Sequence, residues 1–455
     1  MRDFARRVSS VRVWLLLAMI CFSVLAALCG AERARAQSAP AAQAAQPAQA
    51  QTPAAEQKQA YALPPEKLAK AVRLSRIRNL LEITGGVWDI VFLWLLLRFR
   101  AWSVLEAWAV RLTEKRWVQG LVFFAAFLVI TSVAGLPFGI AGHYESRSYG
   151  ISVQSWGGWW WDAAKGLAVS LVVGSPVLLL FHWIVKRWPR RYWLGIWVAT
   201  LPLTLIAIFA SPLVIDPLFN KFEPLTAHHA PLVDKLETVV SRTGIDIPPS
   251  RMFLMKASEK YNGINAYVTG IGASKRYVMW DTATDRLADD EVLFIFGHES
   301  GHYVLGHIPK MLAINMAGTF FLFWACAWGA SWMVRRFGPR WGMEGLEARA
   351  GFVVLLFVIS IASFVLQPLS NGVSRYFEHQ ADVYGQEAIH GIVADPQKTA
   401  VAAFNHLGEA WLEDPNPSPL IEIWLYNHPS VQSRARFAEG YDPWANGGSG
   451  EFFAK

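Results

Sequence analysis

The chain has 455 residues, of which 53% are hydrophobic and 22 are tryptophan, and its mean hydropathy is +0.26. These values exclude an ordinary soluble globular protein and favour a membrane protein. The net charge of +7 is accompanied by no aromatic and basic surface motif for nucleic acid. We therefore expect the lipid bilayer, and no nucleic acid, as the partner of the basic residues.

The N-terminal segment has the pattern of an export signal. Arginines precede an apolar run over residues 13–29, and Ala34, Arg35 and Ala36 form a small-x-small cleavage pattern. We predict a signal peptide over residues 1–36, with an uncleaved anchor as the alternative because the apolar run is long. Residues 37–60 are rich in alanine, glutamine and proline, and this composition predicts a disordered linker.

Six apolar stretches in the rest of the chain come near or exceed the ~20 residues that a helix needs to cross a bilayer. They are residues 80–97, 118–140, 163–185, 192–215, 311–334 and 350–369. We expect Glu82 and Asp89 in the first stretch to face a polar interior, because charged groups in lipid are costly. The pattern predicts an α-helical polytopic membrane protein with about six transmembrane helices after signal removal.

Basic residues gather in the loops that follow the first, third and fifth stretches, at residues 98–116, 186–191 and 335–349. By the positive-inside rule these loops are cytoplasmic, so residues 216–310 and the chain after residue 369 face outward. Basic residues between 67 and 78 are an exception, which we expect the export signal to override. The signal and the composition favour a multi-pass protein of a bacterial inner membrane, with these outward segments periplasmic.

The first outward segment contains a predicted helix and predicted strands. Residues 231–243 have helical apolar spacing, and residues 251–256, 264–269 and 276–280 read as short strands. A second helix begins near the acidic residues 289–291 and must end by Pro309.

This second helix carries the most specific motif of the chain. His298, Glu299 and His302, with Ser300 and Gly301 between them, form an H-E-x-x-H pattern. Residues four apart lie on one face of a helix, so both imidazoles can bind one metal ion. In this pattern the glutamate takes a proton from zinc-bound water as the water attacks a peptide carbonyl. The motif predicts a zinc protease.

A catalytic zinc usually has three protein ligands and one water, so a third ligand is needed. Glu378 is the best candidate, because it lies in a polar helical run, residues 374–382, directly after the sixth apolar stretch. Asp382 shares its face and is placed to orient a ligand histidine. At roughly 100° per residue, His307 points about 140° away from His302 around the helix, and His379 faces away from Glu378.

The sequence resembles the type 1 CAAX prenyl protease family of integral-membrane zinc metallopeptidases over residues 80–437. The matching segments are residues 217–222, 224–225, 265–270, 274–276, 281–282, the metal helix, 374–382 and 427–429, followed by Arg434. The resemblance implies that His298, His302 and Glu378 bind one zinc ion per chain and that Glu299 is the general base. It also implies a water-filled chamber enclosed by the spans and capped by the zinc domain.

The same resemblance implies roles for residues outside the metal motif. Asn265 would hydrogen-bond the substrate backbone, and His428 and Arg434 would contact the substrate or the oxyanion of the tetrahedral intermediate. A strand that contains Asn265 can also pair with an extended peptide by strand addition. The family's eukaryotic members act on prenylated proteins from a cytosolic catalytic side, whereas the predicted catalytic side here is periplasmic.

These observations predict a membrane-integrated zinc metalloendopeptidase that cleaves extended peptide segments. Its expected substrates are peptides or proteins, including misfolded or misinserted membrane and exported proteins. A catalytically silent membrane chaperone with the same fold is the alternative, and it predicts a broken motif. An intramembrane site-2 type protease would need its metal pair inside a membrane helix and a later L-D-G motif, which the sequence lacks.

We divide the chain into segments on this basis. They are a signal peptide (1–36), a disordered linker (37–60), an N-terminal transmembrane domain of four spans (61–215), a zinc-metalloprotease domain with the metal helix (216–310), two transmembrane helices (311–369), the C-terminal part of the protease domain with the third zinc ligand (370–440) and a flexible tail (441–455). We expect the protease domain to be mostly helical with a small β-sheet.

Overall fold

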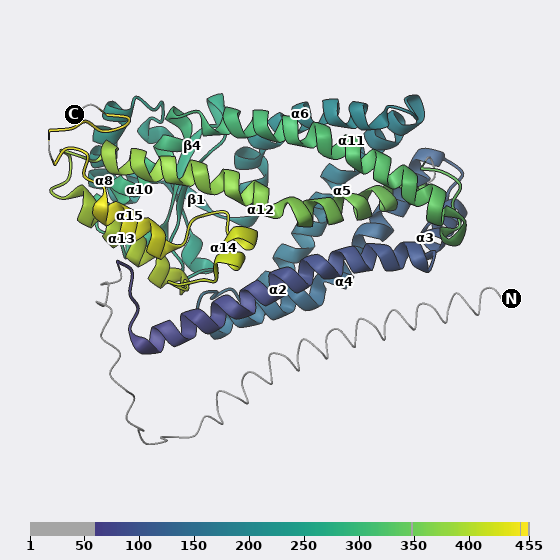
Figure 1. Ribbon diagram of the computed structural model, residues 1–455, viewed down its shortest axis with the longest axis horizontal. Helices are drawn as coiled ribbons and strands as arrows, with labels where there is room; N and C mark the ends of the chain where they lie inside the picture. The colour runs from purple at the N-terminus through teal and green to yellow at the C-terminus, as the bar shows by residue number, and fades with distance from the viewer. Residues whose placement is uncertain (1–59, 347–348, 446, 454–455) are drawn as a thin grey trace, which may run out of the picture.

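The computed structural model describes residues 60–346, 349–445 and 447–453 (Figure 1). The signal peptide and nearly all of the linker lie outside these residues. Long helices extend from one end of the molecule, and a sheet with shorter helices forms the other end (Figure 1). The first helices are α2 (Pro65–Arg98), α3 (Ala101–Leu112), α4 (Arg116–Ser148), α5 (Trp156–Arg187) and α6 (Tyr192–Ala210), and a π-helical turn (Ser211–Ile215) joins α6 to α7 (Asp216–Phe219).

Among the described residues, six helices are long and apolar enough to cross a membrane. They are α2, α4, α5, the continuous segment from α6 to α7, α11 (His307–Trp341) and α12 (Arg349–Ala388). Each contains one of the six apolar stretches of the sequence, so the predicted fold class is confirmed. The chain is a multi-pass membrane protein.

The exposed faces of these helices suit lipid rather than water. Val172 of α5 is 74% exposed, and Ile206 of α6 is 63% exposed. Inward-facing residues such as Leu97, Phe123 and Val353 form an apolar cluster between the helices. Leaving the outer apolar surface in water costs roughly 25 cal/mol per Å², so a bilayer is the medium in which this arrangement is stable.

A sheet in the order β1-β2-β4-β3 forms the other end of the molecule. Strand β1 (Phe222–Pro224) pairs antiparallel with β2 (Met252–Met255), β2 pairs parallel with β4 (Arg276–Trp280), and β3 (Ala266–Thr269) pairs antiparallel with β4. The sequence predicted β2, β3 and β4 but not β1, which is short and ends in a proline. Strand β3 ends the sheet in the described part of the chain, so one of its edges is available for pairing.

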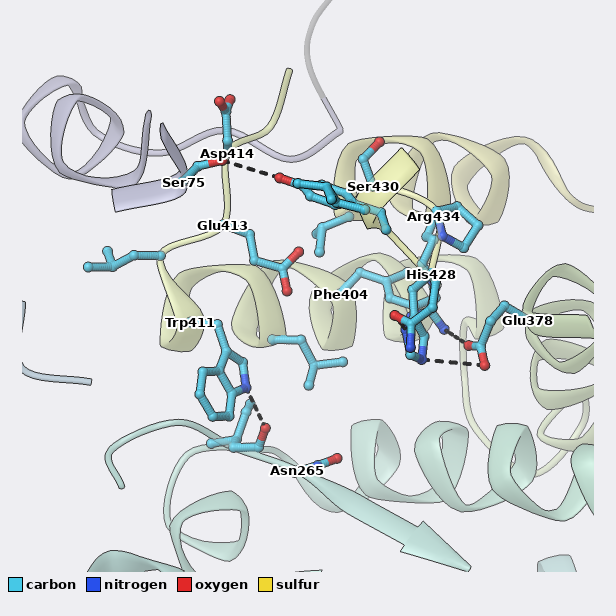
Figure 2. A pocket seen from close by; sticks show the side chains of 18 of the residues that line it. Ser75, Asn265, Glu378, Phe404, Trp411, Glu413, Asp414, His428, Ser430 and Arg434 are labelled. Atoms are coloured by element: carbon cyan, nitrogen blue, oxygen red, sulfur yellow. Dashed lines mark hydrogen bonds and ion pairs between the residues drawn. The ribbon is translucent and has the colours of Figure 1, made fainter. Parts of the chain in front are cut away.

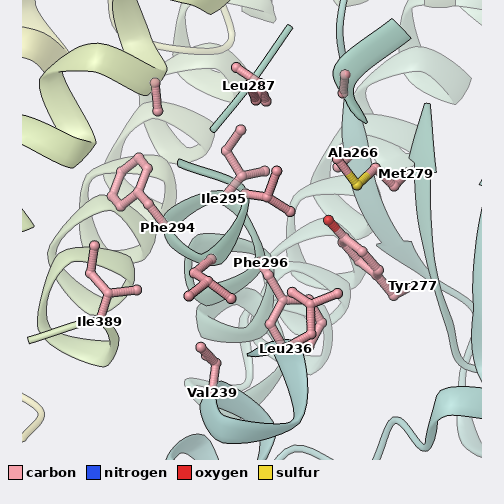
Figure 3. Close-up of a cluster of buried hydrophobic side chains, with 14 of the residues drawn as sticks. Leu236, Val239, Ala266, Tyr277, Met279, Leu287, Phe294, Ile295, Phe296 and Ile389 are labelled. Atoms are coloured by element: carbon pink, nitrogen blue, oxygen red, sulfur yellow. The ribbon is translucent and has the colours of Figure 1, made fainter. Parts of the chain in front are cut away.

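Shorter helices complete this end of the molecule. They are α8 (Thr226–Thr243), α9 (Asp281–Thr284), α10 (Asp289–Val304), α13 (Pro396–Trp411), α14 (Pro419–Leu425) and α15 (Val431–Gly440), with 3-10 turns at Pro249–Arg251, Ala257–Glu259 and Gly272–Ser274. Helix α10 lies at the centre of the core, where Phe296 meets Tyr277 of β4 edge to face with ring centroids 4.8 Å apart. Figure 3 shows Phe294 and Ile295 of the same helix among other apolar side chains.

Helix α12 continues without a break from the membrane region into the protease end (Figure 1). Its N-terminal part is the sixth apolar stretch, and its C-terminal part is the polar run 374–382 together with the residues that follow it. Pro368 lies inside the helix. Glu378 therefore lies on the same continuous helix as the sixth apolar stretch, at the part of that helix that packs against α10.

The C-terminal residues 451–453 contact the inner end of α12. Their backbone N–H groups donate to the carboxylate of Glu387, at 2.6–2.9 Å. The rings of Phe452 and Phe453 lie against Tyr384. The sequence predicts a flexible tail over residues 441–455. Residues 451–453 of this segment lie against the buried carboxylate of Glu387, which needs hydrogen-bond donors in the protein interior.

Candidate metal centre

Three side chains from two helices converge at the protease end of the molecule. Helix α10 supplies His298 and His302, and α12 supplies Glu378. The two Nε2 atoms are 3.3 Å apart, and each lies 3.5 Å from one oxygen of the Glu378 carboxylate. The sequence predicted these three residues as metal ligands, and the structure brings their donor atoms together.

The triangle of donor atoms has the size of a tetrahedral zinc site. Tetrahedral bonds of ~2.0–2.1 Å place neighbouring ligand atoms roughly 3.3–3.4 Å apart. The Oε2 atom of Glu378 is buried and has no hydrogen-bond partner among the described residues. A buried carboxylate oxygen without a donor is costly unless a cation compensates it. The residues present therefore fit a bound divalent metal ion.

Close packing of α10 against α12 sets this geometry. A Cβ atom added at Gly385 of α12 would lie 2.8 Å from the backbone nitrogen of His298, and one added at Gly301 would lie 3.0 Å from Tyr384. The buried Ser300 hydroxyl donates to the Phe296 carbonyl at 2.7 Å. Gly301, the second middle position of the H-E-x-x-H motif, is thus a glycine because α12 lies directly against it.

We predict that Gly385→Ala loosens the metal site. The added methyl group must push α10 away, and overpacking of this kind costs about 1–3 kcal/mol. The midpoint of thermal unfolding and the metal affinity should both fall. Gly318→Ala is the matched control, because Gly318 is also helical and has no heavy atom within 4 Å of its added Cβ. Equal behaviour of the two variants would contradict the packing argument.

Asp382 and Arg434 support the first histidine. The Nδ1 atom of His298 lies 2.9 Å from an oxygen of Asp382, and Arg434 donates to both oxygens of that carboxylate at 2.9 and 2.5 Å. Burial opposes protonation of His298, but Asp382 and Glu378 outweigh it and raise the pKa of His298 to about 10. The two carboxylates thus stabilise a positive charge, such as that of a metal ion, at the place where the donor atoms converge.

Glu299 lies between the metal cluster and the edge strand. Its carboxylate accepts a hydrogen bond from the backbone N–H of Val268 in β3 at 3.3 Å. Burial raises the pKa of Glu299 to about 7. A carboxylate with a pKa near neutrality suits a general base, because it can both take and return a proton.

His302, the second histidine of the motif, contacts His307, which helical periodicity had predicted to point away from it. Helix α10 ends at Val304, Gly306 adopts a left-handed conformation with φ 67°, and α11 begins at His307. The rotation expected for a continuing helix therefore does not apply. The Nδ1 atom of His307 lies 3.1 Å from the Nδ1 atom of His302. His307 does not belong to the group of three candidate ligands, but it contacts one of them.

A cavity of about 460 Å³ opens beside the metal cluster. Figure 2 shows Asn265 on one side of this cavity and His428 with Arg434 on the other. The Nε2 atom of His428 lies 3.4 Å from Glu378. All three residues line the cavity, as the substrate-contacting roles implied by the resemblance require.

Arg434 differs from this expectation in its contacts. Its side-chain hydrogen bonds run to Asp382, and it lies 3.8 Å from the Glu378 carboxylate. The buried Asp382 needs a positive partner, so the guanidinium is committed to the support of the metal cluster. The resemblance implied contact of Arg434 with the substrate or the oxyanion. Its pairing with Asp382 was not predicted, because the two residues belong to different helices far apart in the chain.

Other residues complete the cavity wall, and most of them were not predicted from the sequence. Ser75, Arg78, Asn79 and Glu82 of α2 line the cavity, so a membrane helix forms part of its wall. Glu82 thus faces a polar interior, as the sequence analysis expected. Glu413 follows α13, and its carboxylate faces the cavity (Figure 2), where burial raises its pKa. A lone acid in a loop gives no signal in a single sequence.

The fold and the site together define a multi-pass membrane metalloprotease. Residues 44–221 match the family model described as CAAX prenyl protease N-terminal, five membrane helices, and residues 227–442 match that of peptidase family M48. The chain belongs to peptidase family M48 and is similar to the CAAX prenyl proteases in it. The resemblance seen in the sequence is confirmed, and members of this family depend on a metal ion.

Relatives cover most of the chain. The uncharacterized metalloprotease YhfN of Bacillus subtilis is 34% identical over 83% of this chain and 86% of its own length. The CAAX prenyl protease 1 homolog of Arabidopsis thaliana is 28% identical over 72% of this chain and 75% of its own length. The crystal structure of S. mikatae Ste24p matches 82% of this chain and 89% of its own, with a TM-score of 0.71 and 23% identity. This last likeness confirms the fold.

Proposed function

We propose that the protein is a zinc metalloendopeptidase of a bacterial inner membrane that hydrolyses extended peptide segments on the periplasmic side. The observation that carries the proposal is the triangle of His298, His302 and Glu378, with Glu299 beside it and a cavity in front of it. The alternative, a catalytically silent chaperone, is not favoured, because the chain matches a peptidase family and its motif is intact.

The chemistry divides between the metal and the chain. A zinc ion held by His298, His302 and Glu378 would supply Lewis-acid chemistry, which acidifies water and polarises a peptide carbonyl. Glu299 is placed to take a proton from the attacking water and to pass it to the leaving amine. His428 and Asn265 donate hydrogen bonds to the substrate from opposite sides of the cavity. Asp382 and Arg434 hold His298 in the orientation that binding requires.

The substrate approaches along the open edge of β3. An extended peptide added to this edge lies next to Glu299, which already accepts a hydrogen bond from Val268 of that strand. The cavity is walled by α2 as well as by the protease end. We propose that segments of misfolded or misinserted membrane and exported proteins enter there, because such segments are extended and close to the bilayer.

The distribution of basic residues supports the proposed orientation. The loop before α4 and the junctions of α5 with α6 and of α11 with α12 lie at the end opposite the metal cluster (Figure 1). Arg100 donates to the carbonyl of Arg340 at 3.0 Å, and Arg349 pairs with Glu106 at 2.8 Å. Loops rich in arginine and lysine are retained on the cytoplasmic side. The end of the molecule that holds the metal cluster would then be periplasmic.

Hydrolysis by the purified protein tests the proposed function. Full-length protein in nanodiscs should cleave an unfolded polypeptide such as reduced casein. Phenanthroline should abolish cleavage, and added zinc should restore it, because the protein ligands remain in place when the ion is removed. A farnesylated peptide with a C-terminal CAAX motif, the substrate class in the names of several relatives, serves as the comparison substrate. Cleavage that persists in excess chelator would contradict the proposal.

Labelling of single cysteines tests the proposed orientation. Leu420 belongs to α14, which lies on the side of the sheet, and is 77% exposed, whereas Leu112 ends α3 at the opposite end of the molecule and is 72% exposed (Figure 1). In intact spheroplasts, a membrane-impermeant maleimide should label Leu420→Cys, and it should label Leu112→Cys only after the membrane is permeabilised. The reverse pattern would place the catalytic side in the cytoplasm.

A further inference from the structure

We infer that His307 is a positioning residue that fixes the tautomer and ring orientation of the metal ligand His302. The inference rests on the proposed metal centre and deepens it. A metal-bound imidazole normally donates its second ring N–H to a neighbouring acceptor, and that acceptor tunes the affinity for the ion. Asp382 is the neighbour of His298 at this ring atom, 2.9 Å from its Nδ1, and His307 takes the corresponding place beside His302.

The turn between α10 and α11 brings His307 back to the cluster. Helix α10 ends two residues after His302, and Gly306 at φ 67° lets the chain change direction before α11 begins. The ring of His307 then meets that of His302 at an interplanar angle of 76°. The side chain is almost fully buried, at 1% exposed, and its ring also contacts the ring of Phe377 in α12. It lies behind His302, on the side away from the converging donor atoms.

The hydrogen-bond contacts allow one consistent assignment of protons. The Nε2 atom of His302 faces His298 and Glu378, so its lone pair is the one that would bind the ion. Its Nδ1 atom must then carry the proton and donate to Nδ1 of His307 at 3.1 Å. His307 is therefore protonated at Nε2, from which it donates to the side-chain oxygen of Gln380 at 3.2 Å. The Gln380 amide donates onward to the Tyr376 hydroxyl at 3.3 Å.

This chain of donors connects one ligand helix to the other. Gln380 and Tyr376 belong to α12, which also carries the third ligand Glu378. This series of hydrogen bonds therefore fixes the orientation of the His302 ring relative to Glu378, the carboxylate that would bind the same ion. It does so without adding charge, because a neutral imidazole rather than a carboxylate accepts from His302. The two ligand histidines are thus supported differently, one by an ion pair and one by neutral groups.

Zinc affinity of the purified full-length protein tests this inference. Affinity is measured by competition with a chromophoric chelator, and the unfolding midpoint of the zinc-free protein is measured beside it. His307→Phe keeps a ring against Phe377 but removes the acceptor, and it should weaken zinc binding by about 10–100-fold. His307→Asn should recover part of this loss, because its side-chain oxygen can accept at the position of Nδ1. His379→Phe is the matched control, since His379 packs on Phe437 outside the cluster.

Two results would overturn the inference: wild-type zinc affinity in His307→Phe, or equal losses of affinity in His307→Phe and His307→Asn. Either result would mean that His307 contributes only packing and no hydrogen bond to His302. If His307→Phe does not fold, Gln380→Met removes the next acceptor and should still lower the affinity severalfold. No loss in that variant would overturn the inference as well. Absence of zinc binding in the wild-type protein would instead refute the proposed function.

Discussion

Glu299→Gln is expected to reduce kcat by about 10²–10⁴-fold, the range typical of a lost general base. Glutamine has almost the same shape but cannot take a proton. Its side-chain oxygen can still accept the hydrogen bond from Val268 that the carboxylate accepts at 3.3 Å. A thousandfold loss corresponds to about 4 kcal/mol of transition-state stabilisation. Initial rates of peptide hydrolysis under saturating substrate give the measurement.

The control for this prediction is the metal content. Glu299 does not belong to the group of donor atoms, so Glu299→Gln should bind as much zinc as the wild-type protein and retain its unfolding midpoint. The variant should also hold uncleaved substrate, which makes it suitable for trapping natural substrates from membrane and periplasmic fractions. Cleavage at the wild-type rate would remove Glu299 from the mechanism.

Glu378→Gln is expected to lower zinc affinity by at least about 10²-fold and to abolish hydrolysis. The neutral amide is a weak ligand, and the ion loses the only anionic donor of the cluster. A hundredfold loss corresponds to about 2.7 kcal/mol. The remaining histidines cannot compensate, because two ligands do not complete a catalytic zinc site. Competition with a chelator measures the affinity.

Glu387→Gln gives a matched comparison on the same helix. Glu387 is also buried in α12, but its carboxylate accepts from the backbone of residues 451–453 rather than from the metal cluster. This variant should lower the unfolding midpoint and keep zinc. If Glu378→Gln binds zinc as tightly as Glu387→Gln, the third ligand is not Glu378.

The sequence was sufficient for features that depend on local pattern. The six helices of the described residues that are long and apolar enough to cross a membrane were all predicted, because a long apolar run needs no tertiary information. The metal helix was predicted with nearly correct ends, from its acidic start and from Pro309 beyond it. The pair of His298 and His302 follows directly from helical periodicity, and the structure brings their Nε2 atoms to 3.3 Å.

Features that depend on contacts between distant segments were harder to predict. The position of His307 was misjudged because the rotation rule assumes an unbroken helix. Gly306 is a typical helix-ending signal that was available in the sequence. The pairing of Arg434 with Asp382 joins α15 to α12, and no local pattern reports it. Strand β1 was missed because three residues that end in Pro224 give too short a pattern.

Elemental analysis with X-ray absorption spectroscopy of the purified full-length protein tests the central claim most directly. The account predicts about one zinc ion per chain, bound by two imidazoles and by carboxylate and water oxygens at ~2.0–2.2 Å. It also predicts that His302→Ala loses this ion. A wild-type protein without stoichiometric metal, or a zinc signal that persists unchanged in His302→Ala, would contradict the account.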